Sequence, residues 1–125
     1  MKRILIVDDE SSIIEIISEI LEGSDYEIST ANNGLAAFAL FKENPFDLLI
    51  TDIAMPEMDG VQLIEASLAL LPSLKAIVMT GYAHNYDLEE LRAKSSLGHI
   101  QIFEKPLNLM EILSAANIML AAETV

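Results

Sequence analysis

Polar residues that could take part in phosphoryl chemistry follow several apolar runs of this chain. Asp8 and Asp9 follow the first run, Asp52 ends a later one, and Thr80 and Lys105 come after two more. Carboxylates that lie close together repel one another unless they take up protons or hold a cation. Oxygen ligands suit Mg²⁺, or Mn²⁺ in its place, and Mg²⁺ keeps waters that phosphate oxygens can replace. If the fold brings these residues together, their types predict a metal-assisted reaction of a phosphate.

Each of these residues has a role that such a reaction requires. Phosphoryl transfer depends mainly on positioning and on neutralising the charge of the equatorial oxygens. A metal held by Asp8 and Asp9 could neutralise one oxygen, the Thr80 hydroxyl a second and the Lys105 ammonium a third. Asp52 is then free to act as the nucleophile and to form an acyl phosphate.

The elements that must position these residues alternate between short β-type runs and longer helical patterns. The predicted strands are 3–7, 26–31, 46–51, 76–79 and 100–103. The predicted helices are 11–22, 35–43, 61–71, 87–96 and 107–122. This alternation predicts one α/β domain over residues 1–125, with a doubly wound, parallel five-stranded sheet in the flavodoxin-like order 2-1-3-4-5. Ligands of such sheets bind beyond the carboxyl ends of the strands, so the polar residues are expected to converge there.

The predicted helix 11–22 is amphipathic. Its apolar residues fall on one face and its glutamates on the other, with a spacing of about 100° per residue. The residues expected to face the core are Ile13, Ile14, Ile16, Ile17, Ile20 and Leu21.

Composition narrows the class of protein further. The chain has no cysteine, which excludes disulfides and thiolate metal sites, and its net charge of −13 disfavours direct binding of nucleic acid. No apolar run approaches the roughly 20 residues of a membrane span. The first apolar run ends after four residues at Asp8, which is too short for a secretory signal. We therefore expect a cytoplasmic protein with no membrane partner.

Four motifs resemble the receiver domains of two-component response regulators. They are IVDDE at 6–10, DIAMPEMDG at 52–60, MTG at 79–81 and KP at 105–106, and the resemblance covers essentially the whole chain in the same order. It implies that Asp52 is phosphorylated and that Asp8 and Asp9 hold Mg²⁺, with Asp52 itself and the backbone carbonyl of Ala54 as further ligands.

The resemblance also implies how the modification is used. Thr80 would turn towards the phosphoryl group, Lys105 would pair with it, and the Lys105–Pro106 peptide bond would be cis. The donor would be a sensor histidine kinase, a phosphotransfer protein or a small acyl phosphate. The surface of the elements 87–96, 100–103 and 107–122 would contact a downstream protein, an output domain or a second copy of the chain. Such a domain catalyses only its own phosphorylation and dephosphorylation.

The chain departs from the family pattern at two places. Ile102 stands at the switch position that is usually aromatic, and Phe103 is expected on the opposite face of its strand. The spacing from Thr80 to Lys105 is a few residues longer than usual, which predicts an insertion at 82–86. The helix 87–96 carries few apolar anchors and is predicted to be the least stable element. In this family, Ala54 and Tyr82 occupy positions that influence hydrolysis of the acyl phosphate, and their side chains predict slow hydrolysis.

Three other functions are weighed against this prediction. A Mg²⁺-dependent phosphatase with an aspartyl nucleophile would need a second Asp at position 54, where the chain has Ala54. A flavin or nucleotide carrier would need a phosphate-binding loop after the first strand, where Asp8, Asp9 and Glu10 stand instead. A pseudo-receiver that acts by protein contact alone usually lacks one of the key residues. Phosphorylation with Mg²⁺ and acetyl phosphate separates these possibilities.

Overall fold

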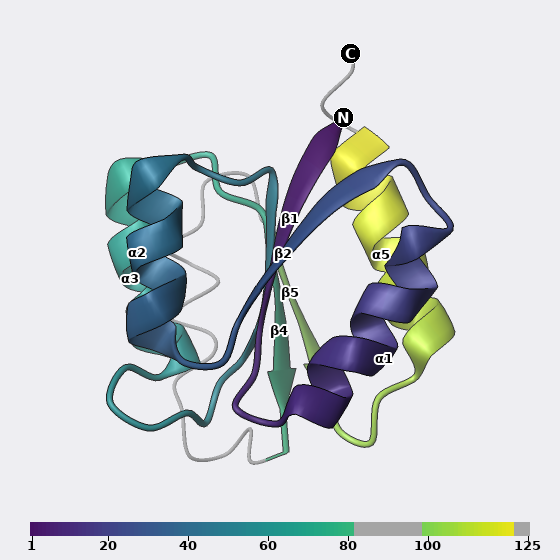
Figure 1. Cartoon of the computed structure of the whole chain (residues 1–125), viewed down its shortest axis with the longest axis horizontal. Helices are drawn as coiled ribbons and strands as arrows, with labels where there is room; N and C mark the ends of the chain where they lie inside the picture. Colours follow the sequence, from purple (N-terminus) through teal and green to yellow (C-terminus); the bar gives the residue numbers. More distant parts are fainter. Residues whose placement is uncertain (82–98, 122–125) are drawn as a thin grey trace.

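The computed structural model describes residues 1–81 and 99–121 of the chain (Figure 1). The strands are β1 (Lys2–Val7), β2 (Tyr26–Ala31), β3 (Leu48–Asp52), β4 (Ala76–Thr80) and β5 (Ile100–Glu104). The helices are α1 (Ser11–Glu22), α2 (Gly34–Glu43), α3 (Gly60–Leu70) and α5 (Leu109–Ala121). The helix expected at 87–96 and the insertion expected at 82–86 lie outside the described residues. Across the described ranges, no helix combines the length and the apolar character needed to cross a membrane.

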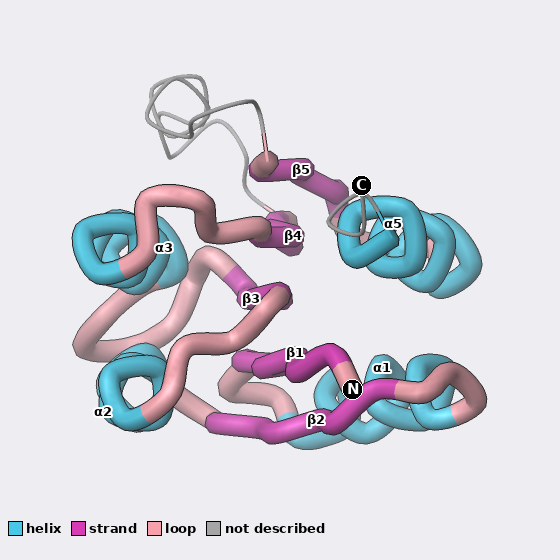
Figure 2. Tube along the Cα trace, turned by 90° about the horizontal axis from the view of Figure 1, so that it is seen from above, coloured by secondary structure: helices cyan, strands magenta, loops and turns pink. Residues whose placement is uncertain are grey.

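The strands form one parallel sheet in the order β2-β1-β3-β4-β5, which confirms the predicted fold. Helices α2 and α3 cover one face of the sheet, and α1 and α5 cover the other (Figure 2). The chain therefore forms three layers, with helices on both sides of a central sheet. All strand ends that carry the polar residues lie at the lower edge of the sheet in Figure 1.

The sheet separates two apolar cores. Along β1, Leu5 and Val7 pack on the side of α2 and α3, whereas Ile4 and Ile6 pack on the side of α1 and α5. This alternation follows from the period of two residues in a strand. Because both faces are covered, the central strands are mostly apolar up to the polar residues at their carboxyl ends, and every residue of β3 and β4 is buried.

The first residues of β3 and α5 differ from prediction, because polar side chains determine where these two elements begin. β3 begins at Leu48 and not at 46, because the Asp47 carboxylate accepts the backbone N–H of Arg3 at 2.7 Å, a donor that a longer ladder would use. α5 begins at Leu109 and not at 107. The Asn108 side chain caps it by accepting the N–H groups of Met110 and Glu111 at 3.1 and 3.3 Å.

One predicted core residue of α1 lies on the surface. Ile17 and Leu21 are buried as expected, but Ile16 is 41% exposed. It lines a groove of about 250 Å³ between α1 and the segment that leads into α5. We call this the α1–α5 groove, and its lining residues are Ile13, Ile16, Ile17, Lys105, Pro106, Leu107 and Leu109. The apolar face of α1 is thus wider than the core that it covers.

Candidate functional site

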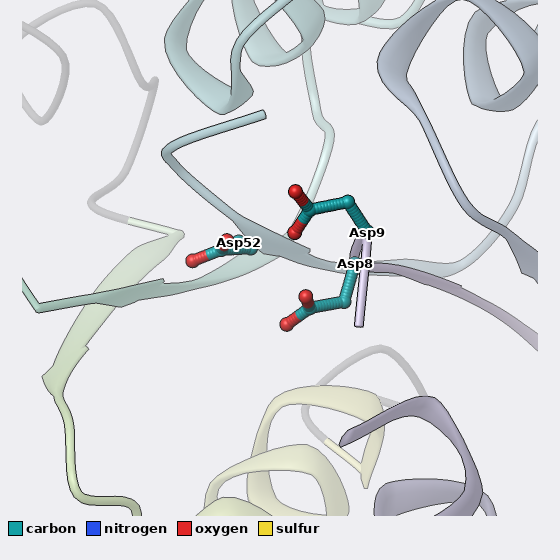
Figure 3. Close-up of side chains that lie close together, drawn as sticks. All are labelled: Asp8, Asp9 and Asp52. Atoms are coloured by element: carbon teal, nitrogen blue, oxygen red, sulfur yellow. The ribbon is translucent and has the colours of Figure 1, made fainter. Parts of the chain in front are cut away.

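Three carboxylates meet at the carboxyl edge of the sheet. Asp8 and Asp9 follow β1, and Asp52 is the last residue of the neighbouring strand β3. Figure 3 shows the side chains of Asp8 and Asp9 leaving the end of β1 towards Asp52. One oxygen atom from each carboxylate lies within 4.8 Å of the other two. The predicted convergence of these residues is therefore confirmed as geometry.

Asp8 is fully buried, and its two oxygens have different surroundings. Oδ1 accepts the backbone N–H of Glu10 at 2.9 Å. Oδ2 is also buried, and within residues 1–81 and 99–121 no hydrogen-bond donor reaches it. Burial raises the pKa of Asp8 from 3.8 to about 6. The Glu10 N–H opposes this rise, and the negative charge of Asp52 adds to it.

Lys105 brings a positive charge to the same place. Its Nζ lies 3.2 Å from Oδ1 of Asp52 and 3.8 Å from Oδ2 of Asp8. Burial lowers the pKa of Lys105, but the negative charges of Asp52 and Asp8 outweigh that effect and raise it, so the ammonium stays charged. Burial raises the pKa of Asp52, and the charge of Lys105 opposes the rise. The Lys105–Pro106 peptide bond is cis, as the resemblance implies.

Thr80 and Lys105 are held together by the β4–β5 edge. Thr80 is the buried last residue of β4, and its carbonyl oxygen accepts the backbone N–H of Lys105 at 2.8 Å. Thr80 shares the sheet face of Val78, which packs in the core beside α2 and α3. The threonine and the lysine thus stand at neighbouring strand ends on the same edge of the sheet as the acidic cluster, and Lys105 contacts two of its carboxylates.

The residues at the switch position follow the alternation of β5. Ile102 is half-buried and packs against the core beside α2 and α3. Phe103 packs against the opposite core, beside α1 and α5. The prediction that these two side chains face opposite sides of the sheet is confirmed. Ile102 shares its face with Thr80, whereas the aromatic ring does not.

The donor set fits a hard divalent cation such as Mg²⁺. The cluster of Asp8, Asp9 and Asp52 offers carboxylate oxygens only, and oxygen is the ligand that Mg²⁺ prefers. The buried Oδ2 of Asp8 is an unsatisfied acceptor that a cation would satisfy. Ala54 is exposed in the loop two residues after Asp52, and the role of its carbonyl as a ligand stays a prediction. Tyr82 lies outside the described residues.

Two glycines at this edge have contacts that the sequence analysis missed. Gly60, expected in the loop, is the first residue of α3, and a methyl group there would lie 2.8 Å from Cα of Ile53 and closer still to the carbonyl oxygen of Asp52. The sequence does contain a signal that predicts the start of α3. The side chains of Asp59 and Gln62 form a capping box, a pairing at a spacing of three residues that marks helix starts. Gly34, expected in a turn, begins α2 and touches the same loop.

Comparisons with known proteins show the family to which the chain belongs. The family model of the response regulator receiver domain matches residues 4–117. The response regulator receiver protein CpdR of Brucella abortus is 34% identical over 125 residues, which cover 98% of this chain and 99% of that protein. The transcriptional regulatory protein ZraR of Klebsiella oxytoca is 31% identical over 83% of this chain, which spans 28% of the ZraR length.

A solved structure of a response regulator shows the same likeness in fold and sequence. The response regulator protein TrrA from Thermotoga maritima, in complex with Mg²⁺-BeF, is 33% identical to this chain. It aligns with a TM-score of 0.81 over 95% of this chain and 99% of that one. Fold, strand-end residues and family model agree, and the chain therefore belongs to the receiver-domain family of two-component response regulators.

Proposed function

We propose that the chain accepts a phosphoryl group on Asp52 in a Mg²⁺-dependent reaction and signals this modification to another protein or domain. The observation that carries the proposal is the contact of Asp52 with Lys105 at 3.2 Å beside the buried, unsatisfied Oδ2 of Asp8. At this point a carboxylate nucleophile lies next to a neutralising ammonium and to a place for a cation.

The chain's own residues divide the chemistry between them. Asp8, Asp9, Asp52 and the Ala54 carbonyl would hold Mg²⁺, which when bound supplies charge neutralisation for the phosphoryl oxygens. A carboxylate oxygen of Asp52 forms a bond to phosphorus while the bond from phosphorus to the donor breaks and the donor leaves with that electron pair. The Lys105 ammonium moves from its pairing with the Asp52 carboxylate to a phosphoryl oxygen.

Thr80 completes the binding of the new group. Its hydroxyl donates a hydrogen bond to a second phosphoryl oxygen, for which the side chain must turn towards the site. Because Ile102 shares the sheet face of Thr80, this movement changes the packing of an aliphatic side chain and not of an aromatic ring. The resulting change is passed to the surface around β5 and α5.

The partners follow from the same chemistry. The phosphodonor is a sensor histidine kinase or phosphotransfer protein, or a small acyl phosphate, and the reaction takes place in the cytoplasm. The apolar α1–α5 groove, which has Lys105 in its wall, supports a protein donor. The receiver of the signal is a downstream protein, an output domain or a second copy of the chain at the α5 side. A net charge of −13 disfavours direct contact with nucleic acid.

Acetyl phosphate tests the proposal without a known kinase. The 125-residue chain is incubated with acetyl phosphate and Mg²⁺, and intact-mass spectrometry measures the gain of one phosphoryl group. We expect the gain in the wild type, its loss in Asp52→Asn and its loss when a chelator removes Mg²⁺. Asp25→Asn, which changes an exposed carboxylate away from the site, is the matched control and should behave as the wild type. A wild type that gains no mass, or an Asp52→Asn variant that still does, would contradict the proposal.

A further inference from the structure

The first turn of α2 and the β3–α3 loop (53–59) pack against each other without space for a side chain. A methyl group on Gly34 would lie 2.9 Å from Cβ of Met58 and 3.0 Å from its Cγ. It would lie closer still to the Met58 carbonyl oxygen, which belongs to the backbone and cannot rotate away. Gly34 is buried, and its φ lies outside the left-handed region, so glycine is required here for space.

The first turn of α2 is itself fixed. The Asn33 side chain caps the helix by accepting the N–H of Ala36 at 2.7 Å. The Asn33 carbonyl also accepts the N–H of Ala37 at 3.1 Å. Ala37 is buried in the core between the sheet and α2. Gly34 therefore contacts the loop from a helix turn that is held in place. A larger residue at this position would displace the loop more readily than the helix.

The β3–α3 loop is anchored at both ends and rests on α2 in its middle. At its start, the Ile53 N–H donates to the Met79 carbonyl at 3.0 Å, and at its end the Gly60 N–H donates to the Ile53 carbonyl at 2.8 Å. In the middle, Glu57 has a φ of 69°, a conformation that costs energy in any residue with a Cβ. Met58 packs half-buried against the core and against Gly34. Met55 is also buried in this core, and the Met58 N–H donates to the Pro56 carbonyl at 2.9 Å. The contact with Gly34 is thus a further restraint on the middle of the loop.

We propose that Gly34 is a positioning residue for the acidic site. Its contact with Met58 holds the β3–α3 loop, which carries Ala54 two residues after Asp52, and thereby raises the affinity of the site for Mg²⁺. The inference rests on the proposed function, because it takes the Ala54 carbonyl as a metal ligand. It also assigns α2, which supplies none of the three clustered carboxylates, a part in the chemistry.

The test is the Mg²⁺ affinity of Gly34→Ala in the absence of any phosphodonor. Isothermal titration calorimetry with MgCl₂, below the melting temperature of every variant, gives the dissociation constant. We expect Gly34→Ala to raise the constant about tenfold, as is usual when the support of a metal ligand is lost. Amide exchange measured by mass spectrometry should rise in the peptide that contains residues 54–59. The matched control is Gly23→Ala, because a methyl group at Gly23 meets nothing within 4 Å.

The outcomes separate positioning from folding. A merely structural role for Gly34 predicts a lower melting temperature with an unchanged dissociation constant for Mg²⁺, and that result would overturn the proposal. If Gly34→Ala does not fold, Met58→Ala replaces it, because this change removes the Cγ that packs against Gly34 and the side chain that holds the loop on the core, and it should also weaken Mg²⁺ binding. An unchanged constant in Met58→Ala would then overturn the proposal. A wild type that binds no Mg²⁺ contradicts the proposed function itself.

Discussion

At the scale of single residues, the ammonium of Lys105 neutralises two carboxylates and competes with a cation for them. Its Nζ lies 3.2 Å from Asp52 and 3.8 Å from Asp8. The same positive charge that opposes the rise in the pKa of Asp52 also repels Mg²⁺. The Lys105 side chain is therefore expected to weaken Mg²⁺ binding and to speed phosphoryl transfer. These two effects can be measured separately.

The change Lys105→Met keeps a long apolar stem and removes the charge. We expect Mg²⁺ to bind about fivefold more tightly, since one repulsion of roughly 1 kcal/mol is lost. The initial rate of phosphorylation by acetyl phosphate at saturating Mg²⁺ should fall, because no ammonium neutralises the phosphoryl oxygen. Lys105→Arg, which keeps the charge, should leave the Mg²⁺ affinity close to that of the wild type. Weaker Mg²⁺ binding in Lys105→Met would mean that the ammonium organises the carboxylates more than it repels the ion.

The raised pKa of Asp8 predicts that the stability of the protein depends on pH when divalent cations are absent. Burial raises its pKa from 3.8 to about 6, so the folded protein favours the protonated form. A raised folded pKa contributes stability that is complete below 3.8 and is lost as the pH rises through about 6. Urea denaturation in EDTA should therefore give a free energy of unfolding that falls between about pH 4 and pH 7, by up to about 3 kcal/mol from this group.

The variant Asp8→Asn isolates this contribution. It cannot ionise, so the stability of the wild type minus that of the variant should decrease as the pH rises. Saturating Mg²⁺ should remove the decrease, because the ion stabilises the charged form. A difference between the two proteins that stays constant from pH 4 to pH 7 would show that Asp8 has an ordinary pKa in the folded state.

At the scale of elements, the β3–α3 loop stores strain beside the acceptor. Glu57 is exposed and has a φ of 69°, a region in which Asn is several-fold enriched over most residues with a Cβ. We expect Glu57→Asn to raise the free energy of unfolding by roughly 0.5–1 kcal/mol, measured by urea denaturation. Glu57→Ala is the control, because it removes the same carboxylate but keeps the strain. If the free energy of unfolding rises equally in both variants, the increase comes from the lost charge and not from the backbone conformation.

Local patterns were sufficient to predict most elements and the members of the acidic cluster. The limits of α1 and β2 agree to the residue, because the period of the apolar residues and the turn residues that follow them are local signals. Asp8 and Asp52 could be placed together without coordinates, because β1 and β3 are neighbours in a parallel sheet and each aspartate stands at a carboxyl end.

Contacts between distant segments could not be predicted. Lys75 looks like an ordinary surface lysine in the sequence, but it is 5% exposed, and its ammonium donates to the carbonyl of Met119 near the end of α5. Gly34 looks like a turn residue, and only the folded chain brings Met58 against it. Ile16 belongs to the apolar face of α1 by its spacing, but the width of the core decides that it stays at the groove.

At the scale of the whole molecule, the sheet separates the side chains that could take part in a switching movement into two groups, one on each face. Thr80 and Ile102 share the face that packs towards α2 and α3, whereas Phe103 packs towards α1 and α5. On the proposed function, a rotation of Thr80 towards a phosphoryl group would leave space on its own face, next to an aliphatic side chain. The aromatic ring next in sequence can respond only through the backbone of β5, which a paired strand restrains. The geometry therefore favours a small rearrangement of Ile102.

The net charge of −13 allows two kinds of cation effect on stability, and they can be separated. Salt screens the self-repulsion of the whole surface and should stabilise the protein gradually without saturating at a stoichiometric point. Mg²⁺ bound at the acidic cluster should instead stabilise in a saturable way, by about 2.7 kcal/mol at a hundredfold excess over its dissociation constant. Thermal denaturation with MgCl₂ and with NaCl at equal ionic strength compares the two effects.

Asp9→Asn is the variant that assigns the saturable part to the site. Asp9 is exposed, so its carboxylate can be removed without leaving an unpaired group in the core. The variant should keep the response to NaCl, because one charge among 20 acidic residues changes the screening little. It should lose most of the additional response to MgCl₂, because a carboxylate of the cluster is gone. If NaCl at equal ionic strength reproduces the full Mg²⁺ effect in the wild type, the ion acts on the surface as a whole and the acidic cluster is not a specific site.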